Sequence, residues 1–406
     1  MSDGEPGVRL EPNVVVVADA QGIADVARRL ASIEVLPLDV ESNGLHAYRA
    51  VLCTVQLALV EDGAVREVFV IDAITAGDEA LAPLRALFGD DGPQKIVHDL
   101  AFDARILAKH GAPLGNVYDT AIAARFLGTP STSLASLVSA RLGVSLSKEL
   151  QHHDWGARPL GEELHPYLAA DVAYLPALAG SLRVDVEQKG IAEEVAAETR
   201  YRLETASAAR DDDDPRPTYA RIKGANDLDP LALSTLRHLA EVREKAAQRW
   251  NVPSFKVVGN DTLLMLSKKR PQSVPELRAM RGLDRGRGVS ITGELLGAIQ
   301  RGARDRDVPE AERAAFFTPP PPVPRELIEA RRAREHRLTA WRRAEAKKRE
   351  VDEQVVLPGH CLQEIADRAP TSREELATIG GIGAIRVTRD GDEILRAVAG
   401  IPVPNP

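Results

Sequence analysis

Two carboxylates that stand two residues apart give the first indication of chemistry in this sequence. Asp39 and Glu41 end the apolar run 33–41, which predicts a strand. Alternate residues of a strand point to the same face of a sheet, so both carboxylates would lie side by side. Adjacent carboxylates repel each other unless cations lie between them, and hard divalent cations prefer carboxylate oxygens. The pair therefore predicts a divalent metal site.

A phenol and a carboxylate share one turn of a predicted helix further along the chain. Tyr167 and Asp171 follow Pro166, a residue that suits the first turn of a helix. Their spacing of four residues places both side chains on one helix face. Two interpretations stay open on these residues alone: a functional pair, or a surface carboxylate beside a packed tyrosine.

A fourth acidic candidate, Asp103, follows a short strand predicted at 95–98. The end of a strand is the usual edge for a site in an α/β sheet. Asp99 is the better candidate to cap the helix that begins here, which leaves Asp103 without a capping role. We expect His98 and Asp119 to be structural residues beside this carboxylate.

Together these side chains match the needs of metal-assisted phosphoryl transfer. Two divalent metals about 3.5–4 Å apart can clamp the attacking and leaving oxygens of an in-line displacement. A tyrosine can orient the attacking water, but its unperturbed pKa near 10 makes it a poor general base at neutral pH. The predicted metal ligands are Asp39, Glu41, Asp103 and Asp171, and the predicted catalytic residue is Tyr167.

A mixed sheet must position these side chains. Apolar runs predict strands at 33–41, 51–60 and 65–72, and the Asp62-Gly63 pair between the last two is a hairpin signal. Strand and helix patterns then alternate, which predicts an α/β domain with helices on the faces of its sheet. Helices are predicted near residues 78–88, 99–110, 119–127, 133–142 and 161–180.

Two segments that break helices divide the chain. Residues 211–217 combine four aspartates with two prolines, and residues 317–324 are rich in proline. The two parts that follow the first break are predicted to be nearly all helical, and their sequences repeat each other. When the sequence is shifted by 99 residues, 266–283 aligns with 365–382, with matching apolar, Pro, Glu-Leu and Gly positions. The predicted parts are a domain at 1–210, a linker at 211–217, a module at 218–316, a linker at 317–324 and a second module at 325–406.

The composition excludes several classes of protein. Of the 406 residues, 44% are apolar and 28% are charged, as in globular proteins with a buried core. No apolar run approaches the 18 or so residues of a membrane span, and the N-terminus lacks the pattern of a signal peptide. The two cysteines lie far apart and cannot form a disulfide framework. We expect a cytoplasmic protein with no membrane partner and, because no phosphate-binding loop motif occurs, no nucleotide cofactor.

The charge is distributed unevenly along the chain. Residues 1–230 carry a net charge of −15, whereas residues 231–406 carry +7. A carboxylate-rich half suits cations, and a basic half suits a polyanion. Two solvated surfaces of opposite sign would give the same counts, so the charges alone leave both interpretations open.

Three blocks of the sequence resemble the exonuclease motifs of the tyrosine-type DEDD superfamily. They are Leu38-Asp-Val-Glu41, the block from His98 to Asp103, and Tyr167-Leu-Ala-Ala-Asp171. Two further blocks, Asp154-Trp-Gly-Ala-Arg-Pro-Leu160 and Tyr118-Asp-Thr120, make the resemblance narrower: residues 30–185 are similar to the ribonuclease D family. The repeated modules resemble the helicase-and-ribonuclease-D C-terminal (HRDC) domain, of which the segment 243–253 is typical.

The resemblance implies a ribonuclease-H-like fold and a 3′→5′ exonuclease that releases nucleoside 5′-monophosphates. It implies two divalent cations, Mg²⁺ or Mn²⁺: Asp39, Glu41 and Asp171 would hold one, and Asp39 and Asp103 the other. Tyr167 would orient the attacking water. The implied partner is RNA, in particular the 3′ ends of structured RNAs such as tRNA precursors. The chain departs from its relatives at His152-His153, where they commonly have serine, which concerns local substrate contacts.

The basic modules suggest where RNA would be held. Phosphate contacts from basic stretches such as Arg331–Arg337 would position RNA without reading its sequence. We expect Phe255 and Trp250 to lie in the core of the first module, and the first module to bind RNA more strongly than the second, because residues 351–406 carry a net charge of −4. The glycine-rich turn 380–383 could cradle a phosphate, although a tight turn between helices needs glycine anyway. The predicted nucleic-acid contacts are Gln56, His98, Phe102, Arg158, Lys256, Lys268 and Lys269.

Two alternatives remain. The chain could be an RNA-binding or assembly protein with a degenerate exonuclease domain, although its complete set of four carboxylates and a tyrosine argues against this. It could also degrade DNA from the 3′ end, since HRDC modules accompany DNA helicases as well. The sugar contacts that would separate RNA from DNA are not visible in the sequence.

Overall fold

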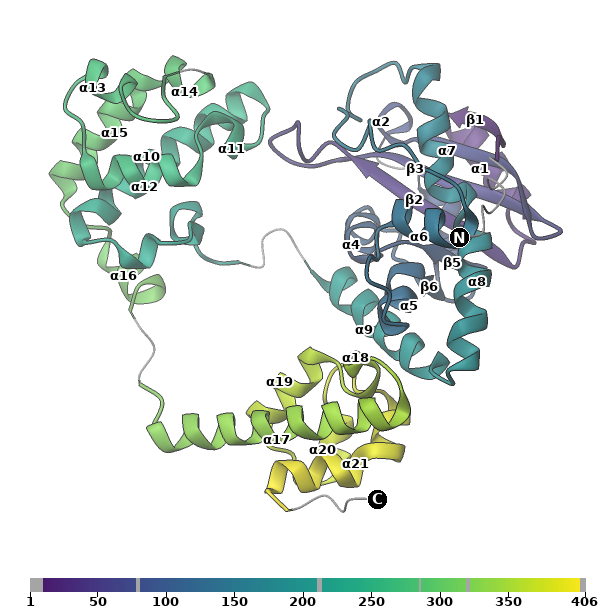
Figure 1. Ribbon diagram of the computed structural model, residues 1–406. Coiled ribbons are helices and arrows are strands. Elements are labelled where there is room, and N and C mark those ends of the chain that lie inside the picture. Colours follow the sequence, from purple (N-terminus) through teal and green to yellow (C-terminus); the bar gives the residue numbers. More distant parts are fainter. Residues whose placement is uncertain (1–9, 78–80, 210–213, 285, 319–321, 402–406) are drawn as a thin grey trace, which may run out of the picture. The chain divides into compact units, whose positions relative to one another are not determined.

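The computed structural model describes residues 10–77, 81–209, 214–284, 286–318 and 322–401 (Figure 1). The chain forms two compact units. The first comprises Met1–Glu41, Leu52–Arg210 and Val323–Pro406, and the second comprises Ser42–Val51 and Asp211–Pro322. The second helical module is therefore part of the same compact unit as the sheet, whereas the first module forms a unit with a short segment that follows Glu41.

A six-stranded mixed sheet is the centre of the first unit, which confirms the predicted α/β fold. Its order is β1-β4-β3-β2-β5-β6. β3 and β4 are antiparallel, whereas β1 pairs with β4, β2 with β5, and β5 with β6 in parallel. The strands are β1 (Asn13–Val17), β2 (Val35–Ser42), β3 (Leu52–Glu61), β4 (Ala64–Asp72), β5 (Gln94–Val97) and β6 (Val117–Asp119).

The predicted hairpin joins β3 to β4. Glu61 pairs with Ala64, so only Asp62 and Gly63 form the turn. Both have a positive φ, 53° and 75° respectively, as a type I′ turn requires. Glycine adopts this conformation without strain, and aspartate tolerates it better than most residues.

Helices flank the sheet, mostly where the apolar pattern predicts them. The helix predicted at 78–88 is shorter than expected: only residues 82–88 are helical, and residues 78–80 lie outside the described part of the chain. The long helix predicted at 161–180 is divided at Tyr174, and a new helix begins at Leu175 with Pro176 in its first turn. The helices are α1 (Ala20–Arg29), α2 (Ala73–Ala76), η1 (Ala82–Leu84), α3 (Arg85–Phe88), α4 (Ala101–Lys109), α5 (Thr120–Phe126), α6 (Leu134–Leu142), η2 (Glu162–Leu164), α7 (His165–Ala173), α8 (Leu175–Gln188) and α9 (Ala192–Ala208).

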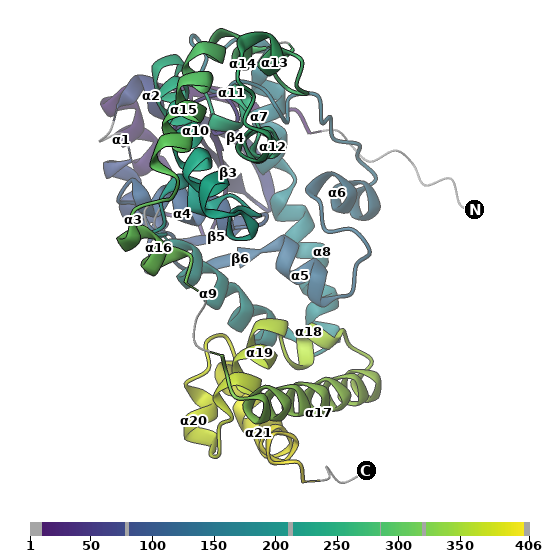
Figure 2. The same ribbon diagram turned by 90° about the vertical axis from the view of Figure 1, so that its left-hand side faces the viewer.

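The second module packs on α9 (Figures 1 and 2). One face of α9 covers α4 and its other face covers α21, so the helix is shared between the two layers. Arg349 and Arg389 of the module both pair with the buried Glu194 of α9, at 2.9 and 2.7 Å. The helices of the module are α17 (Arg325–Arg349), α18 (Glu353–Val356), α19 (Gly359–Arg368), α20 (Arg373–Ala377) and α21 (Gly383–Ala399).

The first module has the same helices with its own core. Its long α10 buries an apolar stripe that includes Leu236 and Leu239 against Leu295 and Ile299 of α15. The helices of this unit are η3 (Thr218–Arg221), η4 (Ala225–Asp227), α10 (Pro230–Trp250), α11 (Ser254–Val257), α12 (Asn260–Lys269), α13 (Val274–Arg278), α14 (Arg287–Ser290), α15 (Thr292–Asp305) and α16 (Glu310–Phe316).

The repeat predicted from the sequence is present in the backbone. The starts of α11, α12 and α13 each lie 99 residues before those of α18, α19 and α20. Residues with positive φ recur at the same offset: Asn251 and Glu350 end the long helices, and Arg270 and Ala369 end the next long helix of each copy. Each module is thus one copy of the same helical unit. Among the described residues, no helix is both long and apolar enough to span a bilayer.

Candidate active site

Three of the predicted ligands meet at one point. Leu36, Leu38 and Val40 are buried on one side of β2, which leaves Asp39 and Glu41 on the opposite side, where α7 presents Asp171. One carboxylate oxygen from each of the three acidic residues lies within 4.8 Å of the others. Three hard oxygen donors at this separation fit a divalent cation.

The electrostatics of this cluster favour a cation strongly. Burial raises the pKa of Asp39 to about 7. Burial, followed by repulsion from Asp39 and Asp171, raises the pKa of Glu41 to about 9. Burial and the charge of Asp39 also hold the pKa of Asp171 well above its usual range. A bound divalent cation would relieve the desolvation and the repulsion together, so the residues present fit the metal that the resemblance implies.

Asp103 lies near this cluster but outside the group of three. It is buried on α4, and its Oδ2 atom has no hydrogen-bond partner within the described residues. Burial, followed by the charge of Asp39, raises the pKa of Asp103 well above its usual range. The four carboxylates of the predicted site thus lie as a close group of three and one neighbour.

The predicted cap of α4 is wrong. Asp99 does not cap the helix, because its backbone is left-handed, with φ of 63°. The N-cap residue is Leu100, and no side chain caps the helix. Asp119 accepts hydrogen bonds just before the helix, from the backbone N–H of Leu100 at 2.8 Å and of Asp99 at 3.3 Å. The same carboxylate caps α5 through Ala121 and Ile122. Asp119 was predicted to be structural, and its hydrogen bonds hold the turn before the helix that carries Asp103.

His98 is held beside this capping carboxylate. Its Nδ1 atom lies 2.9 Å from the Thr120 hydroxyl, which donates to the Val97 carbonyl. Burial lowers the pKa of His98, against the opposing charge of Asp119. These contacts agree with the structural role expected for His98, whereas its predicted contact with nucleic acid stays a prediction.

Tyr167 is the phenol beside the cluster. Its ring packs on Trp155 with 5.6 Å between ring centroids. Burial, followed by the charges of Asp171, Glu41 and Asp39, raises the pKa of the hydroxyl above its usual range. The hydroxyl therefore keeps its proton at neutral pH and can donate a hydrogen bond, in agreement with the expectation that it is a poor general base.

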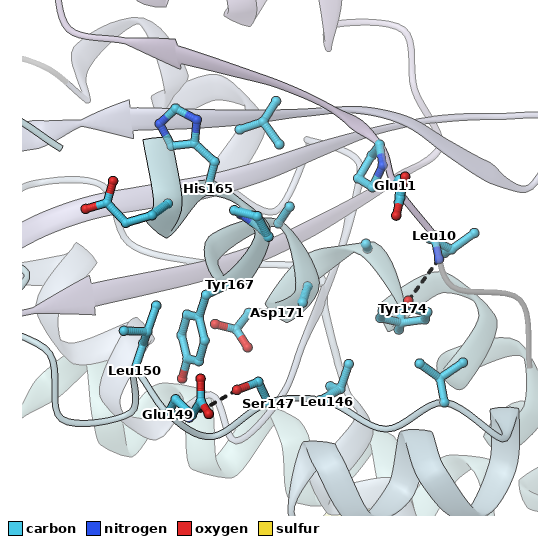
Figure 3. Close-up of a pocket in the computed structure, with 18 of the residues that line it drawn as sticks. Leu10, Glu11, Leu146, Ser147, Glu149, Leu150, His165, Tyr167, Asp171 and Tyr174 are labelled. Carbon is cyan, nitrogen blue, oxygen red and sulfur yellow. Dashed lines mark hydrogen bonds between the residues drawn. The ribbon is translucent and has the colours of Figure 1, made fainter. Parts of the chain in front are cut away.

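A cavity opens beside Tyr167 and Asp171. Its volume is about 660 Å³, within the range of small-ligand pockets. Its walls are α7, the segment 144–150 and the residues before β1, and Leu146, Leu150 and Tyr174 give it an apolar lining. Figure 3 shows Tyr167 and Asp171 on one side of α7, directed toward the segment that carries Ser147 and Glu149. A substrate at the acidic cluster would have this space at its side.

Arg158 has a structural role in the fold, whereas its predicted contact with nucleic acid stays a prediction. Its Nε and Nη2 atoms donate to Oδ1 of Asp72 at 2.9 and 2.7 Å. Its remaining bonds go to the backbone carbonyls of Cys53, Trp155 and Ala157. The arginine thereby ties the loop that carries Trp155 to the ends of β3 and β4. Sequence reasoning missed Asp72, although a carboxylate at the end of the apolar run 68–71 was a signal that it has a buried partner.

The other residues predicted to contact RNA differ in how far their side chains are exposed to solvent. Gln56 is fully buried and donates to the Thr54 hydroxyl at 2.8 Å, so it has no surface to offer a nucleic acid and that prediction is wrong. Phe102, beside Asp103, is 37% exposed and stays a candidate. The remaining candidates, Lys256, Lys268 and Lys269, are exposed on the first module.

The aromatic residues of the first module depart in part from the expectation that both lie in its core. Trp250 packs against the core, as expected. Phe255 is 57% exposed, so the prediction is wrong for this residue.

The basic run of α17 is used within the second module. Arg334 donates to the Ala366 carbonyl, and Arg337 donates to the carbonyls of Ala397 and Val398, which satisfies the ends of two helices. Arg331 pairs with Asp367. These contacts show a structural role for the three arginines, and the expectation that this run contacts phosphates stays a prediction.

Comparison with known proteins agrees with the exonuclease fold and with the two helical modules. The profile of a 3′-5′ exonuclease family matches residues 14–187, and that of the HRDC domain matches residues 232–299 and 331–398. The chain is 30% identical to ribonuclease D of Acidiphilium cryptum over 317 residues, which cover 76% of this chain and 78% of that protein. It is also 30% identical to ribonuclease D of Desulfotalea psychrophila over 64% of this chain and 68% of the relative.

Solved structures share the fold. The Escherichia coli RNase D structure, described as that of an exoribonuclease involved in structured RNA processing, superposes with a TM-score of 0.64 at 22% identity and covers 96% of this chain and 100% of its own. A protein from Bifidobacterium adolescentis superposes with a TM-score of 0.69 at 21% identity, with the same coverage. At these identities the likeness shows the fold alone.

Proposed function

The chain belongs to the ribonuclease D family of 3′→5′ exoribonucleases, and we propose that it trims the 3′ ends of structured RNAs such as tRNA precursors, releasing nucleoside 5′-monophosphates. The observation that carries this proposal is the group of three carboxylates within 4.8 Å, whose mutual repulsion calls for a cation. The same proposal includes the predicted division into one domain and two modules, with linkers at 211–217 and 317–324. It also includes a cytoplasmic location.

Divalent cations are the implied cofactor, and we propose two, Mg²⁺ or Mn²⁺. Asp39, Glu41 and Asp171 would hold one, and Asp39 and Asp103 would serve the other. When bound, the cations supply charge that stabilises both the attacking and the leaving oxygen of the phosphoryl displacement. The single unpartnered oxygen of the buried Asp103 supports its assignment, because a buried carboxylate oxygen without a partner is costly.

The side chains of the site have separate tasks in this reaction. An ionised carboxylate accepts hydrogen bonds and cannot donate them. The carboxylates of the site would therefore bind cations and repel phosphates that are out of place. Tyr167 keeps its hydroxyl proton and would hold the attacking water by a hydrogen bond. Trp155 fixes the ring that carries this hydroxyl, and Arg158 fixes the loop that carries Trp155. Positioning therefore rests on a chain of packed residues that leads from Asp72 to the phenol.

The test uses single-stranded RNA and DNA of one sequence, labelled at the 5′ end and incubated with Mg²⁺, Mn²⁺ or EDTA. We expect a ladder of single-nucleotide steps from the 3′ end, stronger on RNA and absent in EDTA. The variants Asp39→Ala and Asp171→Ala should stop hydrolysis while RNA binding persists. A stronger ladder on DNA would overturn the substrate, and turnover in either variant would overturn the site.

A further inference from the structure

The loop between β2 and β3, residues 43–51, begins two residues after Glu41, one of the predicted metal ligands. Its first residue, Asn43, holds both ends of the loop together. The Asn43 carbonyl accepts hydrogen bonds from two N–H groups within the loop, at 2.7 and 2.9 Å, and its Oδ1 atom accepts one from the N–H of Val51 at 3.0 Å. The loop is thus a folded piece rather than a free connection, so a force on it reaches Glu41 through a very short stretch of chain.

The first module binds this loop through Tyr48, and both belong to the same compact unit. The Tyr48 ring packs against the core of the module, and its hydroxyl accepts a hydrogen bond from Nε2 of Gln248 at 3.0 Å. The backbone N–H of Tyr48 donates to Oδ1 of Asn251 at 3.3 Å. These three interactions form a clasp, the Tyr48 clasp, which holds the loop at the end of α10.

The second module shows that the helical fold does not itself require this pair of amides. At the offset of 99 residues, Lys347 stands in place of Gln248. Glu350 stands in place of Asn251, and both end their helices with a left-handed backbone, with φ of 53° and 47°. Asparagine suits this conformation better than glutamate does, but no backbone reason applies to Gln248, which lies within its helix. The loop that the two amides bind accounts for both of them.

The end of β2 depends on the loop for its position. The pairing of β2 with β5 ends at Pro37, so Glu41 lies four residues beyond the last of these pairs. Only Ser42 follows it in the strand. The charges of Asp39 and Asp171 repel the Glu41 carboxylate, and this repulsion favours its movement out of the group of three. A loop that is itself held in place opposes that movement.

We propose that the Tyr48 clasp positions Glu41 for cation binding, so that the contact of the loop with the first module and the occupancy of the metal site are coupled. It rests on the proposed function, because it takes divalent cations to be bound by Asp39, Glu41 and Asp171. With the clasp closed, the three carboxylates are in place for the cation. With the clasp open, Glu41 moves away from the other two. The residues of the clasp are positioning residues, because they act through Glu41 and not on the reacting atoms.

The variants that test this proposal change the clasp and leave the carboxylates as they are. Asn251→Gly removes the acceptor of the Tyr48 N–H and keeps the left-handed backbone, which glycine adopts without strain. Asn251→Asp keeps an acceptor oxygen at the same position. Tyr48→Phe removes the hydroxyl and keeps the ring. Glu350→Gly is the matched control, because it makes the corresponding change at the equivalent position of the second module.

The first measurement is the Kd of the metal-free protein for Mn²⁺ by electron paramagnetic resonance, which does not depend on cleavage. If only about a fifth of the Asn251→Gly molecules hold Glu41 in place, the apparent Kd rises about fivefold. We expect this rise in Asn251→Gly, a rise of about threefold in Tyr48→Phe, and a change of less than about twofold in Asn251→Asp and Glu350→Gly. The Mg²⁺ concentration for half-maximal cleavage should rise by the same factors, with an unchanged rate at saturating Mg²⁺.

The second measurement is hydrogen exchange at the Tyr48 amide, which reports the clasp directly because this amide donates to Asn251. Coupling between two sites is reciprocal, so saturating Mg²⁺ should slow this exchange about fivefold in the parent. It should have no such effect in Glu41→Gln, which lacks one of the three carboxylates. The Val51 amide is the internal control, because it is bonded within the loop to Asn43 and should exchange at the same rate with and without Mg²⁺.

An unchanged Mn²⁺ affinity in Asn251→Gly, or an equal loss in Glu350→Gly, would overturn the proposal. Exchange at the Tyr48 amide that Mg²⁺ leaves unchanged in the parent would overturn it as well. A parent protein that binds Mn²⁺ with this coupling but cleaves no RNA would refute the proposed exonuclease and leave the clasp standing. Metal-dependent cleavage of RNA, with no effect of the clasp variants on Mn²⁺ affinity, would do the reverse.

Discussion

Glu41→Gln should make the metal-free protein more stable while it abolishes activity. The pKa of Glu41 is raised from 4.5 to about 9. At pH 7 the folded protein therefore binds a proton that the unfolded chain does not. This proton uptake lowers the free energy of unfolding by about 3 kcal/mol, at ~1.4 kcal/mol for each pH unit between the unfolded pKa and pH 7. Coulomb's law gives a similar size, since two unit charges 4.8 Å apart interact by about 3 kcal/mol at an effective dielectric constant near 20. A neutral amide of the same shape removes this cost.

The pH dependence has a defined sign. Because the folded pKa of Glu41 lies above the unfolded value, the folded state binds more protons between about pH 4.5 and 9. The stability of the metal-free parent should fall as the pH rises through this window, and Glu41→Gln should flatten that slope. Saturating Mg²⁺ should reverse the order, because a cation bound only to the folded parent adds about 3 kcal/mol at 100 times its Kd.

The assay is thermal unfolding in EDTA and in Mg²⁺ between pH 5 and 9. The chain has three tryptophans, so a Trp250→Phe/Trp341→Phe background leaves Trp155 of the catalytic unit as the reporter. We expect a gain of about 5–10 °C for Glu41→Gln in EDTA. Glu61→Gln, at the exposed end of β3, is the control and should change little. If Glu41→Gln is no more stable than the parent in EDTA at pH 8, the carboxylates do not repel each other and the site is not assembled as described.

Three further outcomes test the supporting structure. Tyr167→Phe keeps the ring on Trp155 and removes the hydroxyl. Single-turnover rates should then fall about a hundredfold with little change in KM. An unchanged rate would contradict the proposal that the hydroxyl holds the attacking water. Arg158→Met leaves the buried carboxylate of its partner unpaired and should cost about 3–5 kcal/mol by urea unfolding, a loss that Arg158→Lys should restore only in part. Glu194→Gln should weaken the packing of the second module by about 2–4 kcal/mol. The measurement is the urea concentration at which a protease cuts residues 325–406 from the rest of the chain. The control Glu193→Gln, at an exposed neighbouring position, should leave that concentration unchanged.

The sequence predicted the centre of the site because local patterns determine it. Asp39 and Glu41 interrupt an apolar strand, and the period of a strand alone puts both on the face opposite Leu38 and Val40. Tyr167 and Asp171 follow from the period of a helix in the same way. That Asp171 meets the strand pair depends on the topology, which the resemblance to a known family implied and the spacing of residues alone did not.

The contacts that the sequence did not predict concern side chains whose partners are distant in the chain. Arg158 reads as a surface cation until Asp72, 86 residues earlier, is placed beside it. Asp99 precedes α4 as a cap would, but the N-cap residue is Leu100, whose backbone N–H donates to Asp119 at the end of another strand. Phe255 is of a residue type that is usual in protein cores, and only the packing of its module shows that its ring is exposed. Tertiary contacts decide these cases, and a single sequence contains no record of them.

The position of β1 in the sheet has a consequence for aggregation. β1 pairs along β4 from Asn13 to Val17, so it is an edge strand of only five residues that covers the edge of a longer one. Val68 and Val70 of β4 are fully buried on one face of the sheet. A chain shortened past Val17 would expose the free N–H and C=O groups of β4 as a new edge, and an apolar edge of that length is a template for pairing with other chains. These five residues protect the protein from self-association as well as completing its sheet.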